Sequence, residues 1–268
     1  TEKILKIHGI HKDNFDVLNT MERFYHNKLN DVSIDDNSNK EAIIASGVVR
    51  EASLPFDKLI GYDYLYRQMV TDYGKKEAKR LTGLLYDLSL AMADSTKINL
   101  PYCFALDTTK LVFEGRDWGQ LPSKPPKRYF SYVVALNEVI HELSNHVAGA
   151  LAVATFFIDS AYILMYRESV DLEKIQKDKD IRKYIENCIQ TFIHSVNSLS
   201  REATQSAFTN VSIFDKEKLK LILADDAYWF VFQDMGFSKD YVIDFISEIQ
   251  KIYVDFFAVI LFDNKTPC

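Results

Sequence analysis

The clearest chemical candidate in this sequence is a single thiol, Cys103, at the start of a short apolar run. Residues Ile98–Asp107 read Ile-Asn-Leu-Pro-Tyr-Cys-Phe-Ala-Leu-Asp, which predicts a short strand. A thiol can act both as a weak acid and as a one-electron donor. The alternative is that Cys103 is a small buried hydrophobic residue, as most free cysteines are.

The second candidate is a polar run, Ser195–Ile213, that closes with a β-branched strand. It is rich in Asn, Ser, Thr and Gln and contains one cation, Arg201. Many neutral donors around one fork-shaped guanidinium suit the phosphates and sugar of a nucleotide better than a protein core. The alternative is a surface loop whose Ser and Thr residues cap helices and turns.

Other polar residues give weaker signals. Asp94, in Met-Ala-Asp-Ser-Thr, either caps a turn or lies near the site that Cys103 would form. His141 and His146 are five positions apart, so on a helix they point about 140° from each other and cannot share a metal ion. The three cysteines, Cys103, Cys188 and Cys268, contain no Cys-x-x-Cys pair, and we therefore predict no metal site.

Composition limits the class of protein. The 268 residues carry 32 basic and 38 acidic side chains, and this net charge of −6 argues against a protein that grips a nucleic-acid backbone. A sparse, odd number of cysteines fits a reducing cytoplasm. The apolar stretch 147–166 contains Asp159 near its middle, so a buried strand that runs into a buried helix explains it better than a membrane span.

Apolar periodicity predicts alternating strands and helices, which is typical of an α/β protein. Residues 1–50 resemble an arm, and residues 51–268 form the main body. The expected strands are 98–107, 149–157 and 208–214. The expected helices are 55–73, ending at Gly74, then 75–90, 127–145, 158–167, 181–193, 216–224 and 239–262, with a charged connection over 170–180.

The Pro-Tyr-Cys sequence that ends at Cys103, followed by the polar run and by Asn145-His-Val-Ala-Gly-Ala150 between them, resembles anaerobic (class III) ribonucleoside-triphosphate reductase. That family consists of glycyl-radical enzymes, and the resemblance extends from about Ile34 to about Phe262. It implies that residues 51–268 form the first half of a ten-stranded barrel, with surrounding helices.

The resemblance also implies roles for individual residues. Cys103 would give a proton to the departing 2′-hydroxyl of the ribose and join a redox exchange with a second cysteine. Four residues of the polar run would hold the ribose and phosphates: Asn197, Ser198, Ser200 and Arg201. Three positions depart from the family pattern: Ala93 stands where a His is usual, Glu202-Ala203 replaces a small Asn/Gly pair, and Ala207 replaces a common Pro.

No glycine of this sequence lies in a convincing radical motif, so the C-terminal half-barrel, with its finger loop and glycyl radical, is expected on a part of the enzyme outside this chain. The implied reductant is formate or a thiol protein, and a nucleotide effector is expected. The implied partners are a ribonucleotide, the complementary C-terminal half, a radical-SAM activase and a second copy in a homodimer, without nucleic acid or membrane. Two alternatives stay open: a nucleotide-binding or dimerisation module without chemistry, and a glycyl-radical enzyme with another substrate.

Overall fold

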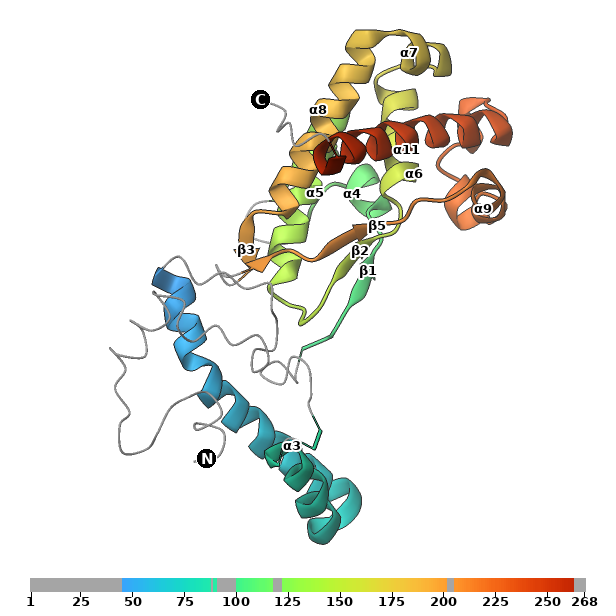
Figure 1. Ribbon diagram of the computed structural model, residues 1–268. Helices are drawn as coiled ribbons and strands as arrows, with labels where there is room; N and C mark the ends of the chain where they lie inside the picture. Colours follow the sequence, from blue (N-terminus) through green and yellow to red (C-terminus); the bar gives the residue numbers. More distant parts are fainter. Residues whose placement is uncertain (1–44, 88, 91–99, 118–121, 202–204, 263–268) are drawn as a thin grey trace. The chain divides into compact units, whose positions relative to one another are not determined.

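The computed structural model describes residues 45–87, 89–90, 100–117, 122–201 and 205–262 (Figure 1). Contacts divide the chain into two compact units. The first consists of residues up to Tyr102 with the short segments Ser144–Gly149 and Ser198–Ala207, and the second of Cys103–Leu143, Ala150–Asn197 and the residues from Phe208 onward. Most of the expected arm over 1–50 lies outside the described residues, so that boundary stays a prediction.

The first unit is built on α3, Ala45–Tyr86. Gly74, with φ of 80° and ψ of 162°, interrupts the helical backbone and divides α3 into two limbs, 45–73 and 75–86. Glycine adopts a positive φ without the steric cost that a Cβ imposes. The predicted break at Gly74 is therefore confirmed.

The same unit contains a two-stranded antiparallel ribbon within the polar run. Strand β3, Leu199–Arg201, pairs with β4, Gln205–Ser206, and the partners are Leu199 with Ser206 and Arg201 with Gln205. The sequence predicted no strand between residues 157 and 208, because polar Ser, Thr and Gln residues give no alternating apolar pattern. Backbone pairing organises this segment where its apolar pattern predicted none.

The second unit contains a three-stranded parallel sheet in the order β1-β2-β5. Its strands are β1, Phe104–Leu106, β2, Leu151–Val153, and β5, Thr209–Val211. Phe104 pairs with Leu151, and Leu151 pairs with Thr209. All three strands lie within the predicted ranges but are shorter. At β2 the reason is that Phe156 and the residues after it belong to a helix.

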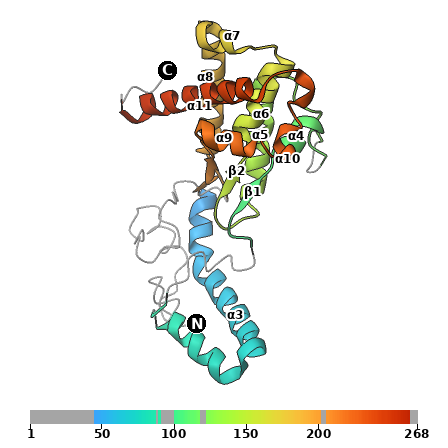
Figure 2. The same ribbon diagram turned by 90° about the vertical axis from the view of Figure 1, so that its right-hand side faces the viewer.

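The rest of this unit is mainly helical (Figure 2). They are α4 Thr109–Phe113, α5 Tyr129–Ser144, α6 Phe156–Tyr162 with a π-helical turn η2 at Ile163–Arg167, α7 Leu172–Lys177, α8 Lys179–Val196, α9 Lys216–Ile222, α10 Asp226–Trp229, the 3-10 turn η3 Gln233–Met235, and α11 Lys239–Phe262. The α/β class is thus confirmed, and 147–166 is a strand followed by a helix as predicted. No helix among the described residues is long and apolar enough to cross a membrane.

The prediction of a charged connection over 170–180 is wrong, since most of this segment is the helix α7. The Asp171 carboxylate accepts a hydrogen bond from the backbone N–H of Lys174 and so caps α7. Asp178 then accepts from the N–H groups of Asp180 and Ile181 and caps α8. Two N-caps seven residues apart explain why a polar stretch forms a helix.

The core of this unit lies where α11 packs on α6 and α8. Figures 1 and 2 both show α11 lying across α8. One face of α11 provides Phe245, Ile249 and Ile252, which are buried. On α5, Leu136 and Ile140 are buried in the same way.

Candidate functional site

Cys103 lies directly before β1, and its side chain is exposed. Its Sγ accepts a hydrogen bond from the backbone N–H of Ala150 at 3.0 Å, and the carbonyl of Ala150 accepts from the N–H of Phe104 at 3.2 Å. The alternative that Cys103 is a buried hydrophobic residue is wrong. The thiol is accessible and is held by one backbone donor.

Cys188 shows the opposite environment. It is buried within α8, and this burial raises the pKa of its thiol to about 12. Because the thiolate is the reactive form, Cys188 is inert at neutral pH. Of the two cysteines that the structure describes, Cys103 is the one able to meet a substrate.

Three chain segments converge at the amino edge of the parallel sheet. Cys103 precedes β1, Ala150 precedes β2 and Phe208 precedes β5. The ladder continues into these residues, since the N–H of Leu151 donates to the carbonyl of Phe208 at 2.8 Å. Along the chain, the polar run leads directly into β5, and the segment 147–150 leads directly into β2.

Asn197 ends α8. Its side-chain Nδ2 donates to the carbonyl of Ile193 at 2.8 Å, which satisfies one of the terminal carbonyls of the helix. Ser198 is exposed, and Ser200 is half-buried. The predicted nucleotide-holding residues therefore begin at a helix terminus and continue into β3.

Arg201 is the most deeply buried of these residues, with 1% of its surface exposed. Its guanidinium donates to the carbonyl of Gly149 at 3.0 Å through Nη1 and to the carbonyl of Val147 through Nη2. A rigid fork that binds two carbonyls of one segment fixes the path of that backbone. The sequence showed that Arg201 is the one cation of the polar run. It did not indicate that its guanidinium binds backbone carbonyls more than fifty positions earlier.

Several sequence candidates lie elsewhere. Asp94, Ala93, Glu202, Ala203 and Cys268 fall outside the described residues. His141 holds its Nε2 at 2.9 Å from the carbonyl of Ser195, so it caps the end of α8. No group of three or more His, Cys, Asp or Glu side chains within the described ranges could hold a metal ion.

Sequence reasoning placed Asp159 in a buried segment but did not predict the hydroxyl cluster that this carboxylate joins at the opposite, carboxyl edge of the sheet. Asp159 of α6 accepts hydrogen bonds from the hydroxyls of Thr155, at 2.8 Å, and of Thr108. Burial raises the pKa of Asp159 from 3.8 to about 7, although these hydroxyls pull it down. The signal available in the sequence was the pair Thr108-Thr109 directly after the first strand, which offers hydroxyl donors at a strand end.

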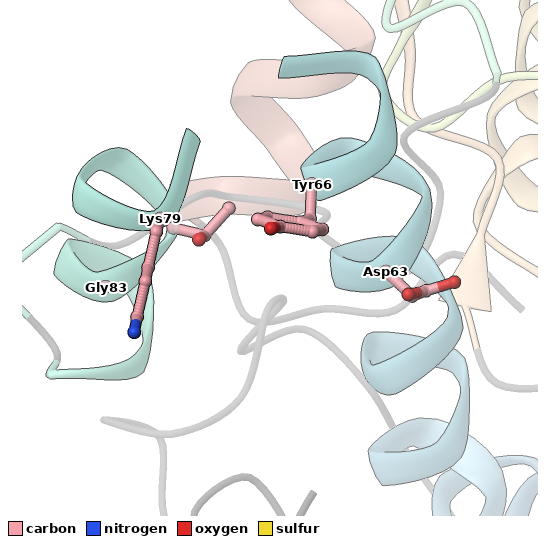
Figure 3. A pocket seen from close by; sticks show the side chains of 5 residues that line it. Asp63, Tyr66, Lys79 and Gly83 are labelled. Atoms are coloured by element: carbon pink, nitrogen blue, oxygen red, sulfur yellow. The ribbon is translucent and has the colours of Figure 1, made fainter. Parts of the chain in front are cut away.

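A cavity of about 510 Å³ lies in the first unit, between the two limbs of α3 (Figure 3). It is lined by Asp63, Tyr66, Lys79, Thr82 and Gly83. Figure 3 shows Asp63 and Tyr66 on one limb and Lys79 and Gly83 on the other. An aromatic ring, an ammonium and a carboxylate thus surround one space.

The family model for the anaerobic ribonucleoside-triphosphate reductase matches residues 83–265. This range includes both Cys103 and the whole polar run. The chain therefore belongs to the anaerobic ribonucleoside-triphosphate reductase family, as its resemblance implied. No curated protein sequence matches it.

Solved reductase structures show the same fold. The anaerobic ribonucleotide reductase from Thermotoga maritima in complex with dATP and CTP is 22% identical, with a TM-score of 0.72, over 96% of this chain and 39% of that one. The same enzyme with dATP in its specificity site gives 21% and 0.70, over 96% and 40%. Another solved structure, of an anaerobic ribonucleotide reductase, gives 24% and 0.73, over 96% and 39%. The chain thus spans about two fifths of the length of these enzymes, and its fold matches part of the reductase fold.

Proposed function

We propose that this chain is the part of an anaerobic ribonucleotide reductase that supplies the substrate-site thiol, Cys103, and a nucleotide-holding segment, the polar run. The observation that carries the proposal is the exposed Cys103 at the amino edge of the sheet, within the range that the family model matches. The polar run enters the next-but-one strand of the same sheet, in a chain whose fold is that of solved reductases.

The reaction replaces the 2′-hydroxyl of a ribonucleotide by hydrogen. A glycyl radical on a part of the enzyme outside this chain supplies the one-electron chemistry. Cys103 donates a proton to the departing hydroxyl, which leaves as water, and a second cysteine shares the exchange. With formic acid as reductant, R–OH and HCOOH give R–H, CO₂ and H₂O; with a thiol protein, two thiols become one disulfide and the same water is formed.

The polar run holds the nucleotide in this proposal. Asn197 and Ser198, which are exposed, and Ser200 offer neutral donors and acceptors to the ribose and phosphates. Arg201 adds a positive charge and, through its two carbonyl contacts, a fixed backbone. Asp94 keeps its proposed place near the site as a weaker candidate.

Cys103→Ser in the complete enzyme tests the proposal. Under anaerobic conditions we expect this variant to bind ribonucleoside triphosphate and to form deoxyribonucleotide at least about a thousandfold more slowly, because a hydroxyl neither exchanges electrons nor gives up its proton readily. Cys188→Ala is the matched control, since this thiol is buried within α8, and it should keep activity. Full activity in Cys103→Ser would sink the assignment. Nucleotide binding by a natural protein that reduces no nucleotide would favour the binding-module alternative.

We also propose that the α3 cavity holds a nucleotide effector. The Thermotoga enzyme binds dATP in a specificity site, which makes an effector reasonable for this relative. The Tyr66 ring suits a base, the Lys79 ammonium a phosphate and the Asp63 carboxylate a sugar hydroxyl.

Lys79→Ala should weaken dATP binding about tenfold in calorimetry. Lys75→Ala should not, because Lys75 is an exposed lysine on the same limb that does not line the cavity. Equal affinities in both variants would place the effector elsewhere.

The remaining partners follow the resemblance. We propose a complementary C-terminal half, a radical-SAM activase and a homodimer, in a cytoplasmic setting. Large exposed side chains on α3, Ile60, Tyr64 and Tyr73, support a protein contact through that helix. Analytical ultracentrifugation of the unmodified protein at rising concentration tests the dimer, and a protein that stays monomeric would exclude it.

A further inference from the structure

Two hydrogen bonds meet on a single peptide group, the one between Gly149 and Ala150. Its N–H, which belongs to Ala150, donates to Sγ of Cys103 at 3.0 Å. Its carbonyl, which belongs to Gly149, accepts from Nη1 of Arg201 at 3.0 Å. Each hydrogen bond lies inside one of the two units, and the peptide bond between residues 149 and 150 is covalent. The link from Arg201 to Cys103 therefore runs through one planar group.

The Arg201 guanidinium is fixed at its own end. Its second nitrogen donates to the carbonyl of Val147, two residues earlier, and the side chain is 1% exposed. The segment that it binds is also held by backbone pairing, since the N–H of Gly149 donates to the carbonyl of Tyr102 at 2.5 Å and that of Ala148 to the carbonyl of Pro101 at 2.9 Å. A rotation of the 149–150 peptide would break the bond to Arg201 and the bond to Cys103 together.

The Arg201 charge can affect Cys103 through the 149–150 peptide group. A cation at a peptide carbonyl polarises the group and makes its N–H a stronger donor. A sulfur that carries negative charge accepts such a hydrogen bond more strongly than a neutral thiol does. Arg201 thus strengthens the hydrogen bond that the Cys103 sulfur accepts without touching the sulfur itself.

We propose that Arg201 is a positioning residue for Cys103, which it orients and activates through the Gly149–Ala150 peptide group. The catalytic meaning of this link rests on the proposed function of Cys103. The link itself does not, because it concerns only the reactivity of a thiol.

The test is the rate at which iodoacetamide alkylates Cys103 in the full chain at neutral pH without oxygen, read for each cysteine by peptide mass spectrometry. Arg201→Lys keeps a cation but cannot bind two carbonyls with one planar fork, and we expect about fivefold slower alkylation, the effect of one lost hydrogen bond. Arg167→Lys is the matched control, because the Arg167 guanidinium also binds two backbone carbonyls, those of Val112 and Pro126, without a link to Cys103. Unchanged alkylation in Arg201→Lys, or equal slowing in Arg167→Lys, would overturn the proposal.

Two further measurements separate this role from a loss of folding. Cys188 is buried, so its protection from the same reagent reports a folded chain in every variant. Ala150→lactic acid, an amide-to-ester replacement, removes the N–H that donates to Cys103 and also weakens the Gly149 carbonyl as an acceptor for Arg201. If Arg201 acts through that N–H, the ester and Arg201→Lys combined slow alkylation no more than the ester alone. Additive effects in the combined variant contradict the proposal.

This assay needs no radical, nucleotide or second polypeptide. Coupled alkylation rates in a protein that reduces no nucleotide would leave the link intact and remove the proposed function. If Cys103→Ser abolishes nucleotide reduction but Arg201→Lys leaves the alkylation rate of Cys103 unchanged, the proposed function stands and the role of Arg201 is wrong.

Discussion

Asp159 is a carboxylate enclosed by hydroxyl groups at the carboxyl edge of the sheet. Besides Thr155 and Thr108, its oxygens face the hydroxyls of Thr109 at 3.3 Å and Tyr132 at 3.5 Å. Thr155 also accepts a hydrogen bond from the backbone N–H of Thr108 at 3.1 Å, so the cluster ties the end of β1 to the start of α6. With 1% of the residue exposed, desolvation outweighs these donors and favours the protonated acid.

The consequence is a stability that depends on pH. The pKa of Asp159 is about 7 in the folded chain and ordinary, 3.8, when unfolded, so the folded state keeps its proton to higher pH. The contribution is complete below about pH 4 and is lost as the pH rises through about 7, by an amount of the order of 4 kcal/mol. We expect the free energy of unfolding of Asp159→Asn, measured in urea, to lack this decline. The exposed Asp226→Asn should retain it, and a constant difference between wild type and Asp159→Asn across pH 4–8 would contradict the account.

At the scale of elements, local signals predicted helices well and strand lengths poorly. The α11 boundaries agree with the expected 239–262, because a long stripe at helical spacing is unambiguous. The apolar run after Gly149 could be strand or helix, and only packing against α11 decides that it changes from one to the other at Thr155. Helix α7 was missed because its signal lies in its caps and not in an apolar stripe.

The backbone around Gly115 leaves no room for a side chain. Gly115 and Gly236 both have positive φ, 80° and 72°, but a Cβ on Gly115 would lie 2.2 Å from the carbonyl oxygen of Ser123, whereas one on Gly236 would meet nothing within 4 Å. Both Ala variants should lose about 1 kcal/mol from backbone strain, and Gly115→Ala should lose a further 1–3 kcal/mol or so from the clash. Urea unfolding checks this, and equal losses would show that the backbone of Ser123–Pro125 moves away from the new Cβ without cost.

At the scale of the whole molecule, the order of motifs along the chain was enough to predict the family, and the family model agrees. Individual site contacts were out of reach. The bonds from Ala150 to Cys103 and from Arg201 to Gly149 join residues 47 and 52 positions apart, and no local periodicity encodes which carbonyl a buried guanidinium will choose. The residue types of the site were therefore predictable, while the environments of Cys103 and Arg201 were not.

We propose that this chain works within a nucleotide-reducing enzyme. The most direct measurement is native mass spectrometry, with an assay of deoxyribonucleotide formation, on the protein isolated without oxygen from its source. We predict that the sequence is found in a polypeptide or complex much heavier than 31.0 kDa that converts ribonucleoside triphosphate to the deoxy form. A species of 31.0 kDa, or a simple dimer of it, that reduces no nucleotide would contradict the account.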